Sequence, residues 1–273
     1  MSGASPGSRL DAAPWIERIA RAGYAAKGVV YVLIGVLAAR AAFGDAGGQS
    51  TGSGGALRTL LDEPFGKVLV GLIGAGLAAY ALWRAFSALL DPEDHGTDAK
   101  GIVVRAGFVL SAIVHGGLAL EALRLASGSA GSGSGDGAEH WTSRLLAAPA
   151  GPYLVGAAAL ALGAYAAVQL YRAFASNIAK RLRLGAIDAD HRRLIERLGR
   201  VGLAARGVVF AIMAYFLMRA ALEYDASEAG GVEQALDWLA ARPDALFAVV
   251  ALGLAAYGLF QLAKARYRVI SAY

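Results

Sequence analysis

Six long apolar stretches alternate with short polar or amphipathic segments along this chain. Alanine, glycine, leucine and valine occupy all faces of each stretch, so none of them shows the polar stripe that a surface helix of a soluble bundle requires. A helix needs about 20 apolar residues to cross a bilayer, and these stretches have that length. They cover residues 23–42, 66–84, 102–125 and 152–174, a fifth stretch that ends at residue 222, and residues 244–265. The pattern predicts six membrane-spanning helices.

The odd-numbered stretches share a repeated opening. Each opens on an arginine followed two residues later by glycine, and a second arginine comes 17 residues after that glycine. The two arginines are therefore about 28 Å apart along a helix, close to the thickness of a bilayer core, and we expect their heads to reach the headgroups. The repeat-defining residues are Arg21, Gly23 and Arg40, then Arg105, Gly107 and Arg124, then Arg200, Gly202 and Arg219.

Three tandem helical hairpins follow from this repetition. We place an N-terminal tail at 1–14, expected to be disordered, and the repeats at 15–97, 98–180 and 181–273. Each repeat carries a short amphipathic segment between its two long helices, expected to lie along the membrane surface, at 57–63, 140–147 and 232–241. The predicted fold class is an all-α polytopic membrane protein with six transmembrane helices, formed from three tandem hairpins in a pseudo-three-fold arrangement.

Composition supports residence in a membrane and charge predicts the orientation. Hydrophobic residues make up 57% of the 273 positions and charged residues 17%, whereas about a quarter of a soluble chain is charged. The loops within the hairpins carry seven of the 26 basic residues and twelve of the 21 acidic ones. The excess of basic residues on the other side predicts cytoplasmic termini, and it needs no nucleic-acid partner. Cysteine is absent from the sequence, which excludes disulfides and thiolate chemistry.

Polar residues inside the even-numbered stretches are the first candidate site. Each stretch has a tyrosine with a polar residue four positions later, on the same helix face. The pairs are Tyr80 with Arg84, Tyr165 with Gln169, and Tyr257 with Gln261. These side chains either line a polar axis or cytoplasmic vestibule, or the tyrosines hold the hairpins together by hydrogen bonds between helices. We favour the second interpretation, because it is the usual role of intramembrane polar groups.

Three ionisable residues lie inside the odd-numbered stretches. His115 is the one histidine within a predicted span, and the other three histidines fall in loops at other depths, so a metal or haem site is not expected. Lys27 and Arg206 come six residues after Arg21 and Arg200. We expect their side chains to snorkel toward the interface.

The segments Ala22 to Tyr31 and Gly76 to Arg84 together resemble the DUF1206 family of bacterial membrane proteins. This resemblance implies a six-helix protein of a bacterial inner membrane and supplies no catalytic residues. The second repeat departs from the pattern, with Ser111 where the others have Lys27 and Arg206. No catalytic or cofactor-binding motif occurs in the sequence, and we expect neither enzymatic activity nor a cofactor. The favoured function is an accessory component that binds membrane lipids or other membrane proteins; the alternative is a small-solute or ion transporter.

Overall fold

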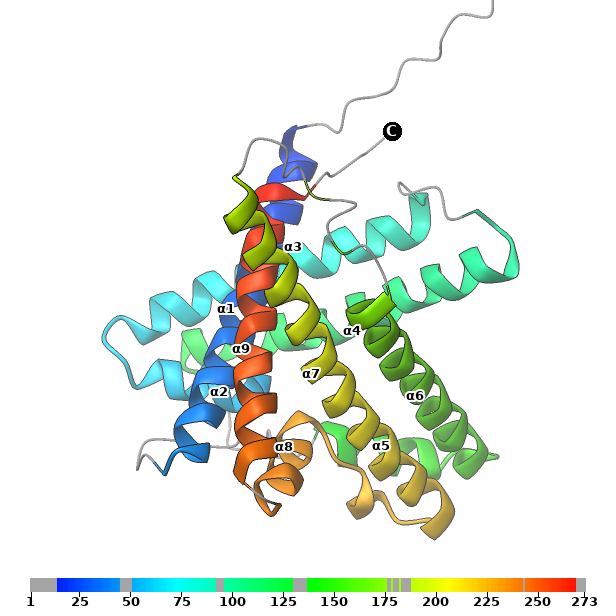
Figure 1. Cartoon of the computed structure of the whole chain (residues 1–273). Coiled ribbons are helices and arrows are strands. Elements are labelled where there is room, and N and C mark those ends of the chain that lie inside the picture. Colours follow the sequence, from blue (N-terminus) through cyan, green and yellow to red (C-terminus); the bar gives the residue numbers. More distant parts are fainter. Residues whose placement is uncertain are drawn as a thin grey trace, which may run out of the picture.

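The computed structural model describes residues 14–44, 51–91, 96–129, 137–175, 178, 182, 188–242 and 244–268. Six helices in it have the length and apolar composition of membrane spans, as predicted. They are α1 (Pro14–Ala42), α3 (Gly66–Leu90), α4 (Ala99–Ser127), α6 (Gly151–Ala175), α7 (Ala189–Glu223) and α9 (Asp244–Tyr267) (Figure 1). The predicted disordered tail lies almost wholly outside the described residues. Only residue 14 of it is described, and it starts α1.

The long helices pack most extensively between repeats. The second helix of each repeat lies along the first helix of the next, which gives the pairs α3 with α4, α6 with α7, and α9 with α1. Packing within a repeat is looser and joins α1 to α3 and α7 to α9. The pairing of α9 with α1 brings the last repeat back to the first, so both described ends of the chain lie at the same end of the molecule (Figure 1).

A recurring arginine contact reinforces this order. The arginine that opens each repeat donates hydrogen bonds to the last carbonyls of a second helix. This is the second helix of the preceding repeat, or of the last repeat for Arg21. Arg105 reaches Ala88 and Leu89 at the end of α3, with distances of 2.8 and 3.2 Å. Arg200 makes the same contact with α6, and Arg21 makes it with α9. A cation at a helix C-terminus satisfies orphan carbonyls and opposes the negative end of the helix dipole. The sequence suggested only that these three side chains reach the headgroups. The structure shows that they also cap helices.

Close backbone contact closes the hairpins of repeats 1 and 3. A Cβ added at Gly23 would lie 2.6 Å from Tyr80 Cα, and one added at Gly202 would lie 2.5 Å from Tyr257 Cα. Only glycine permits an approach this close, which is the usual role of small residues between membrane helices.

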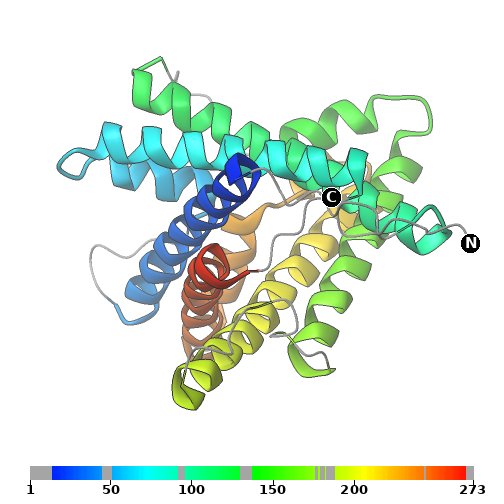
Figure 2. The same ribbon diagram turned by 90° about the horizontal axis from the view of Figure 1, so that it is seen from above.

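The corresponding hairpin of repeat 2 is open. A Cβ added at Gly107 would have nothing within 4 Å, and in the described part α4 and α6 have no packing comparable to the other neighbouring pairs. The sequence offers a reason. Repeats 1 and 3 bring an alanine of the first helix against a glycine of the second, whereas repeat 2 has Leu110 and Ala161 at these positions. Figure 2 shows the α3–α4 pair crossing the remaining long helices obliquely.

Short amphipathic helices connect the long helices of each repeat. They are α2 (Ser53–Leu61), α5 (Gly137–Leu146) and α8 (Val232–Ala240), close to the three predicted segments. The apolar side of α8 is buried through Leu236 and Leu239, and that of α2 through Leu57. None of the three is long enough to cross a bilayer. A 3₁₀ turn, η2 (Ala226–Glu228), precedes α8.

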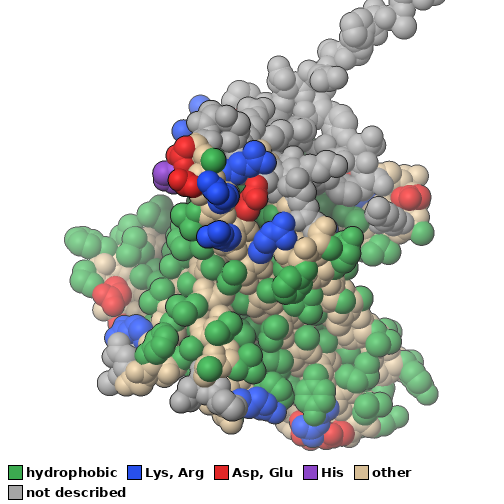
Figure 3. Space-filling model, viewed as in Figure 1, with side chains coloured by type: hydrophobic (Ala, Val, Ile, Leu, Met, Phe, Trp, Pro, Cys, Tyr) green, Lys and Arg blue, Asp and Glu red, His purple; other side chains and the backbone are tan. Residues whose placement is uncertain are grey.

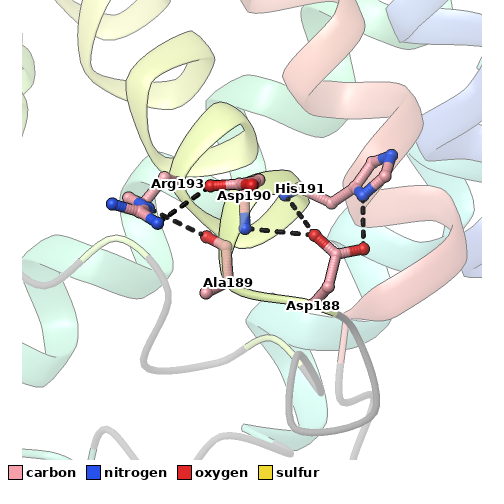
Figure 4. A network of polar contacts seen from close by, with 5 residues as sticks. All are labelled: Asp188, Ala189, Asp190, His191 and Arg193. Carbon is pink, nitrogen blue, oxygen red and sulfur yellow. Dashed lines mark hydrogen bonds and ion pairs between the residues drawn. The ribbon is translucent and has the colours of Figure 1, made fainter.

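Helix α7 begins with a polar network (Figure 4). The Asp188 carboxylate accepts hydrogen bonds from the backbone N–H groups of Asp190 and His191, at 3.1 and 3.0 Å, and also contacts the His191 ring. Asp190 forms an ion pair with Arg193 at 2.8 Å. The hydrogen bonds from His191 lower the pKa of the Asp188 carboxyl below its ordinary value. This network fixes the start of the longest described helix, at the end of the molecule where α1 begins and α9 ends (Figure 1).

The surface has the character expected of a protein in lipid. Large apolar side chains are exposed along the long helices, for example Val103, Leu160 and Val249. Figure 3 shows hydrophobic side chains over the middle of the molecule and most Lys, Arg, Asp and Glu toward its two ends. The span of α4 is the most exposed, since 11% of an 18-residue apolar window in it is buried, against 61% for the corresponding window of α1.

Candidate functional site

All six long helices contribute to one polar cluster in the interior, which we term the hub. Three positions recur in it, one per repeat. The first is occupied by Lys27, Ser111 and Arg206, the second by Tyr31, His115 and Phe210, and the third by Tyr80, Tyr165 and Tyr257. The third-position tyrosine of each repeat packs on the second-position ring of the next repeat. The ring centroids are 4.6 Å apart for Tyr80 and His115, 5.5 Å for Tyr165 and Phe210, and 4.8 Å for Tyr257 and Tyr31. The hub thus preserves the pseudo-three-fold relation between the repeats.

Arg206 is the most heavily coordinated residue of the hub. Its Nε donates to the Tyr31 hydroxyl at 3.2 Å, and its Nη1 donates to the hydroxyls of Tyr165 and Tyr257 at 3.2 and 3.0 Å. The guanidinium also lies 4.5 Å from the Phe210 ring centroid. Arg206 is only 8% exposed. Its head is therefore turned into the protein, and the prediction that it snorkels is wrong.

Lys27 occupies the equivalent place in repeat 1. Its Nζ donates to the Tyr80 hydroxyl at 3.4 Å and lies 4.8 Å from the centroid of the Tyr80 ring. The residue is 4% exposed, so the snorkelling predicted for it is also wrong. In repeats 1 and 3, the third-position tyrosine thus binds the cation on the first helix of its own repeat. This is the contact that the hairpin-stabilising interpretation expected. Ser111 replaces the cation in repeat 2.

His115 has its described partners in Ser111 and Tyr80. His115 Nδ1 lies 2.8 Å from the Ser111 carbonyl oxygen, and the ring is buried against Tyr80. In the described part of the chain, no three His, Asp or Glu side chains gather closely enough to hold a metal ion. The geometry therefore describes a hydrogen-bonded histidine that packs inside the hub.

The other predicted polar residues lie around the hub. Arg84 joins it, since its Nε donates to the Tyr80 hydroxyl at 2.9 Å and its Nη2 to the Tyr24 hydroxyl at 3.3 Å. Gln169 and Gln261 are buried, at 2% and 1% exposure. One amide atom of each, Nε2 of Gln169 and Oε1 of Gln261, lacks a hydrogen-bond partner among the described residues. Tyr80 and Tyr257 are also buried, whereas Tyr165 is 42% exposed, beside the open hairpin.

The sequence indicated Tyr80, Tyr165, Tyr257 and His115 as candidate site residues. Lys27 and Arg206, which bind tyrosine hydroxyls of the hub, were instead expected to snorkel. A charged residue inside a membrane span costs about 2.5 to 3.5 kcal/mol on insertion scales. This cost indicates that such a residue has a partner inside the protein, and it could have identified both cations from the sequence. Lys27 and Arg206 are the charged residues between the bracketing arginines of repeats 1 and 3. Hydroxyl acceptors and aromatic faces offset part of the cost, since a cation over an aromatic ring gains about 0.5 to 2 kcal/mol.

Six apolar helices around a buried polar hub define a multi-pass α-helical membrane protein. The chain belongs to the family described as "Domain of Unknown Function (DUF1206)", whose model matches residues 22–91, 106–176 and 201–268. The family model thus recurs three times, in agreement with three tandem repeats. A relative, "Uncharacterized protein YxxB" of Bacillus subtilis (strain 168), is 34% identical over 262 residues, which cover 95% of this chain and 94% of the relative. No solved structure matches the chain significantly.

Proposed function

We propose that this protein is an accessory component of a bacterial inner membrane that binds a transmembrane helix of another protein in the open hairpin between α4 and α6. One observation carries the proposal. Repeats 1 and 3 close their hairpins through Gly23 and Gly202, but a Cβ added at the equivalent Gly107 would have no neighbour within 4 Å. A position that packs a helix in two repeats is vacant in the third.

The character of the α4 surface supports a helix as the occupant. Gly107 and Ser111 are four residues apart and therefore share one face of α4, in the small-xxx-small spacing that lets membrane helices approach closely. By the equivalence with Gly23, this face is directed toward α6. A lipid tail would gain no hydrogen bond from Ser111 of α4 or from the half-exposed Tyr165 of α6. A helix could pack on the small residues and bond to the polar ones.

Site-directed crosslinking in native membranes tests this, and the lack of cysteine makes single-cysteine variants unambiguous. Gly107→Cys and Ser111→Cys report on the proposed face. Val109→Cys is the matched control, because it is exposed on the same helix but points about 200° away. We expect a cysteine-reactive photocrosslinker to join residues 107 and 111 to one and the same protein, identified by mass spectrometry, and residue 109 to lipid only.

Two results would overturn the proposal. Equal labelling from positions 107, 109 and 111 would indicate a surface that only meets lipid. Adducts of the chain with itself alone would assign the open hairpin to a second copy. In a further variant, Gly107→Leu, the leucine side chain would occupy the open hairpin. We expect this variant to abolish the adduct at position 111, and we expect the protein to purify intact.

A transporter of small solutes or ions is the second candidate function, and the observation that favours it is the presence of charged residues in the hub. The burial of Tyr80, Tyr257 and His115 favours the accessory role, since side chains that are buried against other rings line no continuous path to water. Solute flux in proteoliposomes separates the two. A stable Arg84→Leu protein with altered flux would favour transport.

A further inference from the structure

We propose that the hub binds a small monovalent anion, of the size of chloride, between Arg206, Lys27 and the tyrosine hydroxyls. This inference goes beyond the proposed accessory function and does not depend on it. It starts from a charge imbalance. Lys27 and Arg206 are 4% and 8% exposed, and among the described residues no aspartate or glutamate forms an ion pair with either.

The two cations share one aromatic neighbour. Both contact the Tyr31 ring, with Lys27 Nζ 6.0 Å and Arg206 Cζ 5.6 Å from its centroid. Their hydrogen-bond partners are tyrosine hydroxyls and not the carboxylates that usually pair with buried cations. Buried charges in proteins are normally paired or bind an ion of opposite sign. The arrangement therefore lacks an anion.

The hydrogen-bonding groups of the hub are predominantly donors. Each tyrosine oxygen that accepts from a cation still has its own O–H to donate. The hydroxyls of Tyr31, Tyr165 and Tyr257 all lie within 3.2 Å of an Arg206 nitrogen, so their protons are available around one guanidinium. Arg206 Nη2 forms no hydrogen bond with any described residue. N–H and O–H donors around two positive charges are the chemistry of an anion site.

Depth favours a small free ion over a lipid headgroup. Arg206 follows Arg200 by six residues, about 9 Å along the helix, and Arg200 already lies at the level of the α6 C-terminus. A phosphate that remains attached to its lipid stays nearer the surface. The half-exposed Tyr165 marks the side from which the ion enters, next to the open hairpin.

A chloride titration of the purified full-length protein tests the site. The thermal unfolding midpoint is measured in detergent while chloride replaces gluconate at constant ionic strength, and the broadening of the ³⁵Cl NMR line reports binding directly. We expect a saturable rise of the midpoint together with broadening. Absence of both in the unmodified protein would overturn the proposal, and so would a rise that appears only after anionic phospholipid is added, which would assign the site to a headgroup.

Variants locate the ion. Arg206→Gln should abolish the chloride response, whereas Arg219→Gln on the same helix should preserve it, because Arg219 is exposed and pairs with Glu223. Tyr165→Phe removes one hydroxyl at a half-exposed position and keeps the inference testable if Arg206→Gln does not fold. It should weaken chloride binding about tenfold, the effect of one lost hydrogen bond to a charged group. An unchanged affinity in Tyr165→Phe, or in a folded Arg206→Gln protein, would place the ion elsewhere and refute the site.

Discussion

Arg21 donates a hydrogen bond to the carbonyl oxygen of Ala265, 244 residues further along the chain, at a distance of 2.6 Å. This contact joins the first helix of the first repeat to the end of the last helix. Arg105 and Arg200 make the same contact with α3 and α6. One residue type at one position of each repeat thus caps the preceding second helix and helps close three repeats into one molecule.

Removing this cap should weaken the closure. We expect Arg21→Gln to lower the stability by about 1 kcal/mol, the typical contribution of a cation that bonds to the carbonyls of a helix C-terminus. The thermal midpoint in mild detergent measures it. Arg18→Gln is the control, since Arg18 is an exposed basic residue on the same helix, one turn away. Equal effects of the two variants would mean that the net charge, and not the cap, is responsible.

Two equivalent glycines should respond differently to the same change. Gly23→Ala places a methyl group 2.6 Å from Tyr80 Cα, and it should cost about 1 to 3 kcal/mol, because α1 and α3 must move apart. Gly107→Ala meets no atom within 4 Å and should lie between neutral and about 1 kcal/mol more stable. Thermal or chemical unfolding of both variants checks the difference. A large loss for Gly107→Ala would show that α4 and α6 pack in the membrane.

The tyrosine hydroxyls of the hub should contribute to stability. Tyr257→Phe removes an oxygen that accepts from Arg206 at 3.0 Å and leaves a buried donor without its partner. We expect a loss of about 1.5 to 3 kcal/mol, as for hydrogen bonds to charged groups. Tyr215→Phe, at a tyrosine of α7 that is 53% exposed, should change the stability by less than about 0.5 kcal/mol. Similar values for the two variants would argue against a structural role for the hub bonds.

The start of α7 should loosen in acid. The pKa of the Asp188 carboxyl is lowered by its bonds to His191, so the ionised form stabilises the folded helix start. This contribution is complete above the ordinary aspartate pKa of about 3.9 and is lost as the pH falls through the lowered value. Amide hydrogen exchange at residues 190 and 191 should therefore accelerate, relative to the rest of α7, below about pH 4. Asp188→Asn should lose most of this pH dependence.

The distribution of basic residues predicts the orientation. A reporter that is active only in the periplasm should be silent when fused to either end of the chain and active when inserted at Gly52 or Gly230. Activity at the C-terminal end alone would contradict an even number of spans. Activity at both ends, with silence at the two loops, would keep the six spans and reverse the orientation.

Local features of the sequence were sufficient for most of the fold. The six apolar stretches and the 17-residue spacing from glycine to arginine depend only on residues near in sequence, and they predicted the number of long helices and the three repeats. The amphipathic segments likewise predicted α2, α5 and α8 within a few residues at each end. The candidate tyrosines and His115 were found because a polar residue is conspicuous in an apolar helix.

The sequence by itself therefore determined the class of protein, its repeats and the helix that carries each candidate residue, because hydropathy and periodicity are properties of a segment alone. Tertiary structure decided which segments meet. It turned Lys27 and Arg206 inward, directed Arg21 to a helix end 244 residues away, and left repeat 2 open. The physical reason is that these outcomes depend on atoms from distant segments. Whether two helices touch depends on single side chains such as Leu110 and Ala161. Hydropathy and periodicity do not predict which distant residues these side chains meet.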